Sequence, residues 1–329
     1  MQLFFMGNER AAMQVLWMVV GAWLFATMGV CIKLASADFN TAEIIFYRGL
    51  IGMGLLWLLA SSQKVSLRTQ RPWGHTWRSV VGVVAMGCWF YAISRLPLAS
   101  ATTLNYMSSL WIAVILMASA VCSWHPRSAR PRQALQLPLV AAIGVGFGGV
   151  VLMLQPSFAQ GQGTPALIGL GSGLLSALAY LQVAKLSRVG EPESRTVFYF
   201  NVGSVVGGLI GMGMLGVSPW PGLERALWLL PIGVLAAGGQ LCMTRAYAQA
   251  RTPRGTLVVA NLQYCGIVFA SIYSVWLFGD RLDLLAWVGM VLIVGSGIAA
   301  TVLRARSPDA APRTAPARAS SAAPATPSR

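Results

Sequence analysis

Polar side chains inside long apolar stretches are the residues of this sequence that could carry chemistry, because an apolar surrounding offers them no partners. Asn105 and Asn261 each lie within such a stretch, and Gln263 and Tyr264 follow Asn261 closely. An asparagine that faced apolar surroundings would lose its hydrogen bonds to water. Each asparagine therefore either ties neighbouring helices together or lines a cavity, and both interpretations are open. We place all four residues in a candidate substrate-binding site.

Arg48 is a charged residue well inside the second apolar stretch. One interpretation pairs it with Glu43, which lies close by in the sequence. The other uses the guanidinium group to draw an anionic or carboxylate group into a cavity. The short separation favours the pair with Glu43, and Arg48 remains a substrate-binding candidate.

Aromatic and small residues suggest how such a cavity would be walled and packed. Trp23, Trp111 and Tyr180 could form walls around an apolar or flat ligand, although most aromatic residues of this kind pack in a core or at an interface. Tyr91 and Tyr247 occupy matching positions near the ends of two stretches, which suits gating residues. Glycines at four-residue spacing predict close approach between helices; they are Gly144 and Gly148, and Gly203, Gly207 and Gly211.

Catalysis and metal binding find no support in the sequence. The five cysteines lie in apolar runs without metal-ligand spacing, and no hydrolase, metalloprotease or phosphate-binding motif is present. We therefore predict no catalytic residue, no metal site and no cofactor, and we do not expect an enzyme. Of the few carboxylates, only Glu43 approaches an apolar stretch. The sequence therefore offers few acidic side chains from which a proton relay across the membrane could be built.

The composition identifies the surroundings of the chain as lipid. Of 329 residues, 56% are hydrophobic and only 10% are charged, whereas a soluble domain carries about 25% charged residues. The net charge of +15 comes from basic residues in short loops between apolar runs, not from one patch. That distribution is a signal of membrane topology, and it argues against a nucleic-acid partner.

Ten stretches approach the length of about 20 residues that a helix needs to cross a bilayer. We predict an all-α integral membrane protein with ten transmembrane helices. Basic residues gather in alternate loops, while Arg95, Arg225 and Arg281 occupy the others, so the positive-inside rule makes both termini cytoplasmic. Residues 1–13 form a cytoplasmic N-terminus, and the Ala-, Pro-, Ser- and Arg-rich residues 304–329 form a disordered cytoplasmic tail. The predicted helices are 14–36, 42–60, 77–94, 97–122, 138–155, 165–187, 194–216, 226–249, 253–278 and 284–303.

A weak internal repeat divides the chain into two five-helix halves, residues 14–155 and 165–303. An odd number of helices in each half means that the halves enter the membrane from opposite sides. Inverted repeats of this kind are typical of secondary transporters, whose sites lie between the halves. The recurring pairs keep their order: Lys33-Leu34 with Lys185-Leu186, Phe46-Tyr47 with Phe198-Tyr199, and Tyr91-Ala92 with Tyr247-Ala248.

These features resemble the EamA-type members of the drug/metabolite transporter superfamily over nearly the whole chain except the tail. The resemblance implies two EamA-like repeats and export of amino acids or similar compounds. It rests on four motifs: Phe46-Tyr47-Arg48, the Ala92 to Ala99 joint, Phe278-Gly279-Asp280-Arg281-Leu282, and Trp287-Val288-Gly289 before a Gly-rich final helix.

We therefore expect a secondary transporter that moves a small metabolite across the inner membrane by alternating access, in the direction of efflux. The scarcity of carboxylates suggests facilitated diffusion or weakly coupled efflux. The alternative is a channel or receptor-like protein without coupled transport. The expected partners are the small-molecule substrate and the lipid bilayer, and the protein is a monomer or a homodimer.

Overall fold

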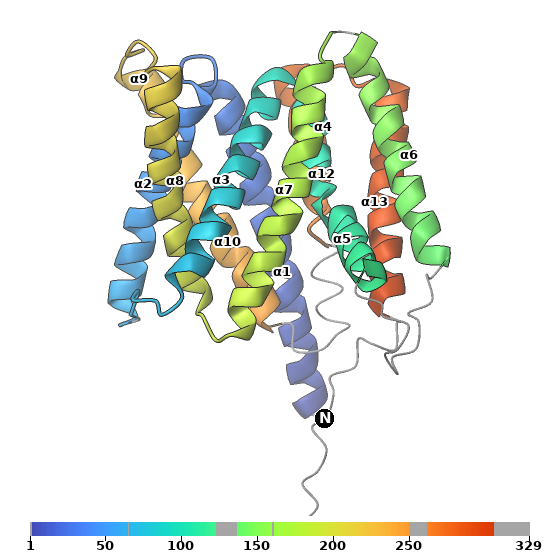
Figure 1. The fold of residues 1–329 in the computed structure, drawn as a ribbon, viewed down its shortest axis with the longest axis horizontal. Helices are drawn as coiled ribbons and strands as arrows, with labels where there is room; N and C mark the ends of the chain where they lie inside the picture. The colour runs from blue at the N-terminus through green and yellow to red at the C-terminus, as the bar shows by residue number, and fades with distance from the viewer. Residues whose placement is uncertain (1, 65, 123–136, 160, 250–261, 306–329) are drawn as a thin grey trace, which may run out of the picture.

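The computed structural model describes residues 2–64, 66–122, 137–159, 161–249 and 262–305, and every regular element in these ranges is a helix (Figure 1). Asn261 lies outside the described residues. So does the predicted tail, except for residues 304 and 305, which belong to the final helix. The helices are α1 (Gln2–Ala35), α2 (Thr41–Ser62), α3 (Pro72–Arg95), α4 (Leu98–Tyr106), α5 (Ser108–Cys122), α6 (Leu137–Ala159), α7 (Gly163–Arg188), α8 (Glu193–Leu215), α9 (Leu223–Ala226), α10 (Leu229–Gln249), α12 (Cys265–Phe278) and α13 (Leu284–Ala305).

The helices have the length and the surface of a multi-pass membrane protein. Six segments of the described residues are long and apolar enough to cross a bilayer, and three shorter apolar helices accompany them: Val140–Met153, Cys265–Phe278 and Leu284–Ala299. Large apolar side chains such as Met214 and Trp276 are more than four-fifths exposed. A soluble protein would hide such a surface, whereas lipid covers it at no penalty.

Exposed tryptophans lie at both ends of the bundle. Trp57, Trp73 and Trp77 lie near the α2–α3 joint, and Trp276 and Trp287 lie near the α12–α13 joint at the opposite end. Tryptophan favours the level of the lipid headgroups, where its ring is apolar and its N–H can reach water. The two groups therefore mark the two surfaces of the membrane.

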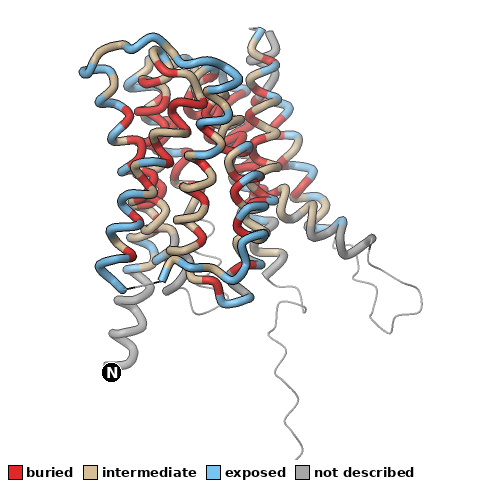
Figure 2. The backbone as a smooth tube through the Cα atoms, turned by 60° about the vertical axis from the view of Figure 1, so that its left-hand side comes forward, coloured by how far each residue is buried: buried red, intermediate tan, exposed pale blue. Residues whose placement is uncertain are grey.

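Helices that are distant in the sequence pack in long pairs: α2 along α8, α1 along α10, α3 along α7, and α6 along α13. The α6–α13 pair stands on the right of Figure 1 and α2 and α8 on the left, with α1, α3, α4, α5, α7, α10 and α12 between them. The buried residues gather in the middle of this bundle (Figure 2). The first and second parts of the chain are thus interleaved.

Small residues allow these pairs to approach closely, although not always those that the sequence suggested. On α8, a Cβ at Gly207 or Gly211 would lie 2.7 Å from Val83 Cγ1 or Ala42 Cβ, as close packing predicts. The prediction of close packing at Gly144 and Gly148 is wrong, because a Cβ at either position would meet no described atom within 4 Å. Gly146 and Gly149 make the close contacts of α6 instead.

The predicted helix 97–122 is two helices, with a break at Met107. The Met107 N–H donates to the carbonyl oxygens of both Thr103 and Leu104, at 3.2 and 3.3 Å, so an α-helical bond is shared with a 3₁₀-type bond at this point. The break lies beside α7, where Gly173 allows the Leu104 carbonyl to pack closely. The sequence gives no sign of such a break, because no glycine or proline interrupts residues 98–122.

We predict that Gly149→Ala destabilises the protein, because its Cβ would lie 2.8 Å from the Gly289 carbonyl oxygen and 2.9 Å from Leu292 Cβ. Gly148→Ala is the control, since it gains the same helix propensity without a contact. Relative to the control, Gly149→Ala should lower the free energy of unfolding by about 1–3 kcal/mol. Thermal unfolding of both variants in detergent measures this difference. Equal unfolding temperatures would contradict the packing of α6 on α13.

Candidate functional site

A cavity of about 620 Å³ lies among α1, α2, α3, α4, α5, α7, α8 and α10, within the range of small-molecule sites. Its lining is mainly apolar, with a few polar groups. It extends from the level of Tyr106 to Glu191, at the end of the bundle where the α2–α3 and α7–α8 joints lie. The polar lining residues are Arg48, Arg78, Asn105, Ser108, Ser109, Ser176, Glu191, Thr196, Gln240 and Gln263; the aromatic ones are Phe25, Trp89, Phe90, Tyr106, Tyr180, Phe200 and Tyr264.

Asn105 borders the cavity and also ties two helices together. Its Nδ2 donates to the hydroxyl oxygens of Ser172 and Ser176 on α7, at 3.1 and 3.2 Å, and the residue is buried. These bonds satisfy the amide group within the bundle. Both interpretations of Asn105 that the sequence left open therefore apply at once.

Gln263 and Tyr264 also line the cavity, from the segment that leads into α12. The Tyr264 hydroxyl forms a hydrogen bond with Ser109 Oγ on α5. The bond joins two helices that the sequence analysis assigned to different halves. Asn261, which was predicted to belong to the same site, lies outside the described residues.

Arg48 lines the cavity, but the predicted pair with Glu43 is wrong. The Glu43 carboxylate accepts bonds from the Asn40 N–H and from the N–H and hydroxyl of Ser218, at 2.6–3.0 Å. It completes the cap of α2 with Asn40, so it is unavailable to Arg48. Within the described residues, Nε and Nη1 of Arg48 are buried without a hydrogen-bond partner.

The predicted aromatic residues divide into lining and non-lining groups. Tyr180 lines the cavity. Trp23 is not in the lining: it is 44% exposed, and its Nε1 donates to the Tyr273 hydroxyl at 2.9 Å. Trp111 lies outside the lining as well and packs edge-on against Phe147.

The cavity does not test the prediction that Tyr91 and Tyr247 act as gates. Tyr91 does not line it and lies under the guanidinium group of Arg95, 5.7 Å from ring centre to Cζ. The side chain of Tyr247, on α10, is outside the described residues. Gating by either residue stays a prediction.

Arg78 is a lining residue that the sequence analysis missed. The predicted third helix begins at residue 77, which would leave Arg78 in the first turn, next to the basic loop. The helix begins at Pro72 instead, and proline is favoured in the first turn of a helix. That proline was the available signal, and it places Arg78 in the second turn. Its Cζ lies 4.2 Å from the centre of the Phe200 ring.

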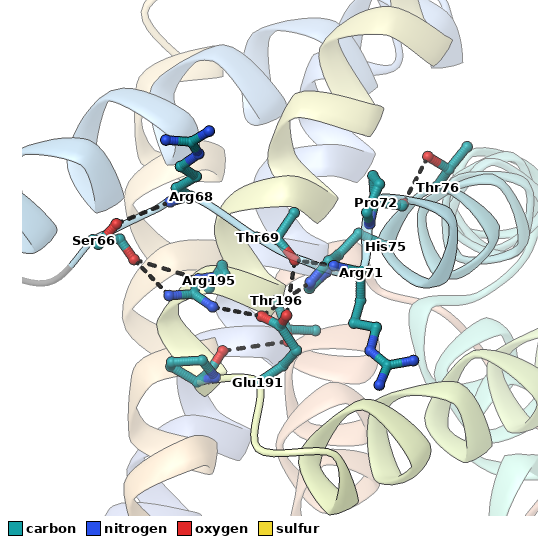
Figure 3. Close-up of polar contacts among 11 residues, drawn as sticks. Ser66, Arg68, Thr69, Arg71, Pro72, His75, Thr76, Glu191, Arg195 and Thr196 are labelled. Carbon is teal, nitrogen blue, oxygen red and sulfur yellow. Dashed lines mark hydrogen bonds and ion pairs between the residues drawn. The ribbon is translucent and has the colours of Figure 1, made fainter.

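Glu191 is the second missed residue, and a polar cluster surrounds it (Figure 3). Its carboxylate accepts hydrogen bonds of 2.8 Å from Arg195 Nη1 and Thr69 Oγ1. His75 Nε2 lies 3.4 Å away, and the His75 ring stacks on Tyr199. Arg195 also donates to the Ser66 carbonyl oxygen. The cluster joins the α2–α3 joint to the α7–α8 joint at one end of the cavity.

The environment of Glu191 lowers its pKa below the ordinary value of 4.5. Burial alone raises the pKa, because it disfavours the charged form. The interactions with Arg195, Thr69 and His75 outweigh that effect. Glu191 is therefore a carboxylate at neutral pH.

Three links between described side chains join the two parts of the chain at the opposite end of the bundle. Lys33 Nζ lies 3.0 Å from Asp280 Oδ2, and Arg225 Nη1 lies 2.5 Å from Asp38 Oδ1. The third link is the bond between Glu43 and Ser218. No described lining residue reaches this level of the bundle. The links therefore separate the cavity from this end.

Within the described residues, no group of three His, Cys, Asp or Glu side chains could hold a metal ion. The cavity instead combines apolar walls with amide, hydroxyl and guanidinium groups. This chemistry suits reversible binding of a small organic molecule.

Comparison with known proteins gives consistent results. The model of the EamA-like transporter family matches residues 12–155. Over 286 residues the chain is 32% identical to the Pseudomonas aeruginosa protein named pseudopaline exporter CntI, covering 87% of this chain and 94% of that protein. It is 27% identical to an uncharacterized transporter of Helicobacter pylori, over 83% of this chain and 89% of that one.

A solved crystal structure has the same fold. It covers 89% of this chain and 99% of its own, with a TM-score of 0.60 and 19% sequence identity. A likeness at this level of identity speaks to the arrangement of the helices and not to the ligand.

We predict that Glu191→Gln lowers the free energy of unfolding by about 1–3 kcal/mol at pH 7, because it removes the charge that binds Arg195. Since the pKa of Glu191 is lowered, its contribution is present above the ordinary pKa and is lost as the pH falls through the lowered value. The difference from wild type should hold from pH 8 to pH 6, as measured by thermal unfolding. Exposed Glu224→Gln is the control; a difference that disappears by pH 6 would contradict the assignment.

Proposed function

Because this chain belongs to the EamA-like transporter family, we propose that it is a secondary transporter that exports a small metabolite across the inner membrane by alternating access. Relatives of the chain are named as transporters, one of them as an exporter. The observation that carries the proposal is the cavity among the helices, which polar links separate from one end of the bundle.

We propose that the ten predicted helices form two inverted repeats, residues 14–155 and 165–303. Support comes from the contacts between helices. If α1, α2, α3 and α6 are exchanged with α7, α8, α10 and α13, the pair α1–α10 becomes α7–α3, and the pairs α2–α8 and α6–α13 map onto themselves. Two related halves can adopt two arrangements of similar energy, which alternating access needs.

The arrangement of polar links suits an inward-facing state. The end that carries the α2–α3 and α7–α8 joints is rich in basic residues, among them Lys64, Arg68, Arg71 and Arg195. The positive-inside rule makes this end cytoplasmic, together with both termini. The cavity lies toward that end, and the links of Lys33 with Asp280 and Arg225 with Asp38 close the outer end.

In this proposal the lining residues Arg48, Asn105, Tyr180, Gln263 and Tyr264 contact the substrate. We include Asn261 in this set, because it lies close to Gln263 and Tyr264 in the sequence. Tyr91 and Tyr247 act as gates, and the protein works as a monomer or homodimer.

A channel or receptor without coupled transport is the second candidate. A channel would need a path open at both ends, and the three outer links oppose one. An enzyme has less support, because the relatives named above are transporters.

We predict that Ala179→Phe abolishes export, because Ala179 is 4% exposed and lines the cavity, where the larger ring would occupy the space of a substrate. Leu178→Phe is the matched control, since Leu178 is its neighbour on α7 and faces outward. The measurement is metabolite profiling of the medium from cells that express wild type or either variant at matched membrane levels.

Compounds should accumulate outside with wild type and with Leu178→Phe, and not with Ala179→Phe. Thermal unfolding of the three purified proteins shows that the variant is folded. Undiminished export by a folded Ala179→Phe protein would place the transport path elsewhere.

A further inference from the structure

We propose that Arg48 and Arg78 form an anion subsite in the cavity and that the transported substrate carries a carboxylate or a similar anionic group. The inference rests on the proposed transport function, and it adds the chemical class of the substrate. Its basis is two lining guanidinium groups that both approach one aromatic ring, neither of which has an acidic partner among the described residues.

Arg48 is a buried cation without an ionic partner in the part of the chain that the structure describes. The residue is 3% exposed, and its Nε and Nη1 make no hydrogen bond to any described residue. Its Cζ lies 5.4 Å from the centre of the Phe200 ring. A cation–π contact attracts the charge but satisfies none of the N–H donors. A buried donor that has no partner is unfavourable, so the arrangement favours a ligand that accepts these hydrogen bonds.

Arg78 extends away from the membrane surface. A long basic side chain near a helix end ordinarily reaches back toward water. The guanidinium group of Arg78 instead lies over Gly82, one turn deeper in α3, where a Cβ would overlap Nη1. Nε and Nη1 of Arg78 are likewise buried without a partner in the described chain. The absence of a side chain at Gly82 leaves room for this inward position.

The acidic residues near the two arginines are already engaged. Glu43 caps α2 and binds Ser218. Glu191 lines the same cavity, but its carboxylate is held by Arg195 and Thr69. The cavity therefore carries an excess of positive charge, which a bound anion would neutralise. Planar guanidinium groups match the two oxygens of a carboxylate.

The other lining residues indicate the chemistry of the rest of the substrate, apart from its anionic group. Trp89, Phe90 and Tyr106 provide apolar walls, and Gln240 provides an amide whose Oε1 is buried without a hydrogen-bond partner among the described residues. The substrate that fits is an amphipathic carboxylate with an N–H or O–H donor, of a size suited to about 620 Å³.

The first test measures binding to the purified wild-type protein in detergent. The probes are phenylacetate and phenylsuccinate, each compared with its amide, and the readout is the shift in unfolding temperature. At least one acid should stabilise wild type more than its amide, and Arg48→Gln or Arg78→Gln should weaken binding about tenfold or more, as expected for a lost charged hydrogen bond. Arg68→Gln is the control, because Arg68 is exposed in the α2–α3 joint.

A purely structural role for the arginines predicts a different result. If they hold the fold together, either glutamine variant should unfold at a lower temperature without ligand. An anion subsite predicts an unchanged or higher unfolding temperature, because each substitution removes an unpaired buried charge. A lower temperature for both variants, with unchanged binding of the acids, would overturn the subsite.

The second test profiles the medium of cells that express wild type, Arg48→Gln, Arg78→Gln or Arg68→Gln. The expected exported compounds are anionic, and their export is lost with the first two variants and kept with the third. Export of neutral or cationic compounds would overturn the subsite while leaving the transport function standing. Arginine-dependent binding of the acids without export of any compound would support the subsite and contradict the transport function. Acids that stabilise no better than their amides would overturn the subsite.

Discussion

The hydrocarbon core of a bilayer cannot form hydrogen bonds, and this constraint governs where the polar side chains within the apolar helices can lie. Asn105 meets it with two serines of α7, and Tyr264 meets it with Ser109 of α5. Glu43 meets it by capping α2 and binding Ser218. Arg48 and Arg78 do not meet it with protein partners in the described structure, and both line the cavity. The polar groups thus divide into those that hold the bundle together and those that are left for a ligand.

The polar links lie where a transporter would need contacts that break and re-form. At one end Glu191 joins the α2–α3 joint to the α7–α8 joint, and at the other Lys33 binds Asp280. Between these levels the helices pack through small residues and apolar side chains, as at Gly207 and Gly211. Contacts of that kind lack directional bonds, so helices can slide along them at little cost. Ionic links near water are also modest in strength, and a substrate of ordinary affinity could shift the balance between them.

The sequence predicts the broad class of the fold well, because apolar stretches and loop charges follow directly from the bilayer. Helix boundaries were less predictable: the break at Met107 and the early start of α3 at Pro72 leave the apolar pattern almost unchanged. The position of that start decides whether Arg78 lies next to the loop or far enough along α3 to line the cavity. Nearness in the sequence also led to the wrong ion pair. Glu43 precedes Arg48 by little more than one helical turn, yet its carboxylate binds Ser218. Tertiary contacts, which sequence spacing does not encode, decide such cases.

Alternating exposure of the cavity is the central claim, and cysteine accessibility tests it most directly. The measurement labels Ser176→Cys, a lining residue, with a membrane-impermeant maleimide from each side of oriented vesicles, in a protein whose native cysteines are replaced. Breaking the outer link with Lys33→Ala and Asp280→Ala should raise labelling from outside and lower it from inside, because one state grows at the expense of the other. Labelling that rises from both sides together would indicate a channel, and labelling that stays confined to one side would indicate a static site; either result would contradict the account.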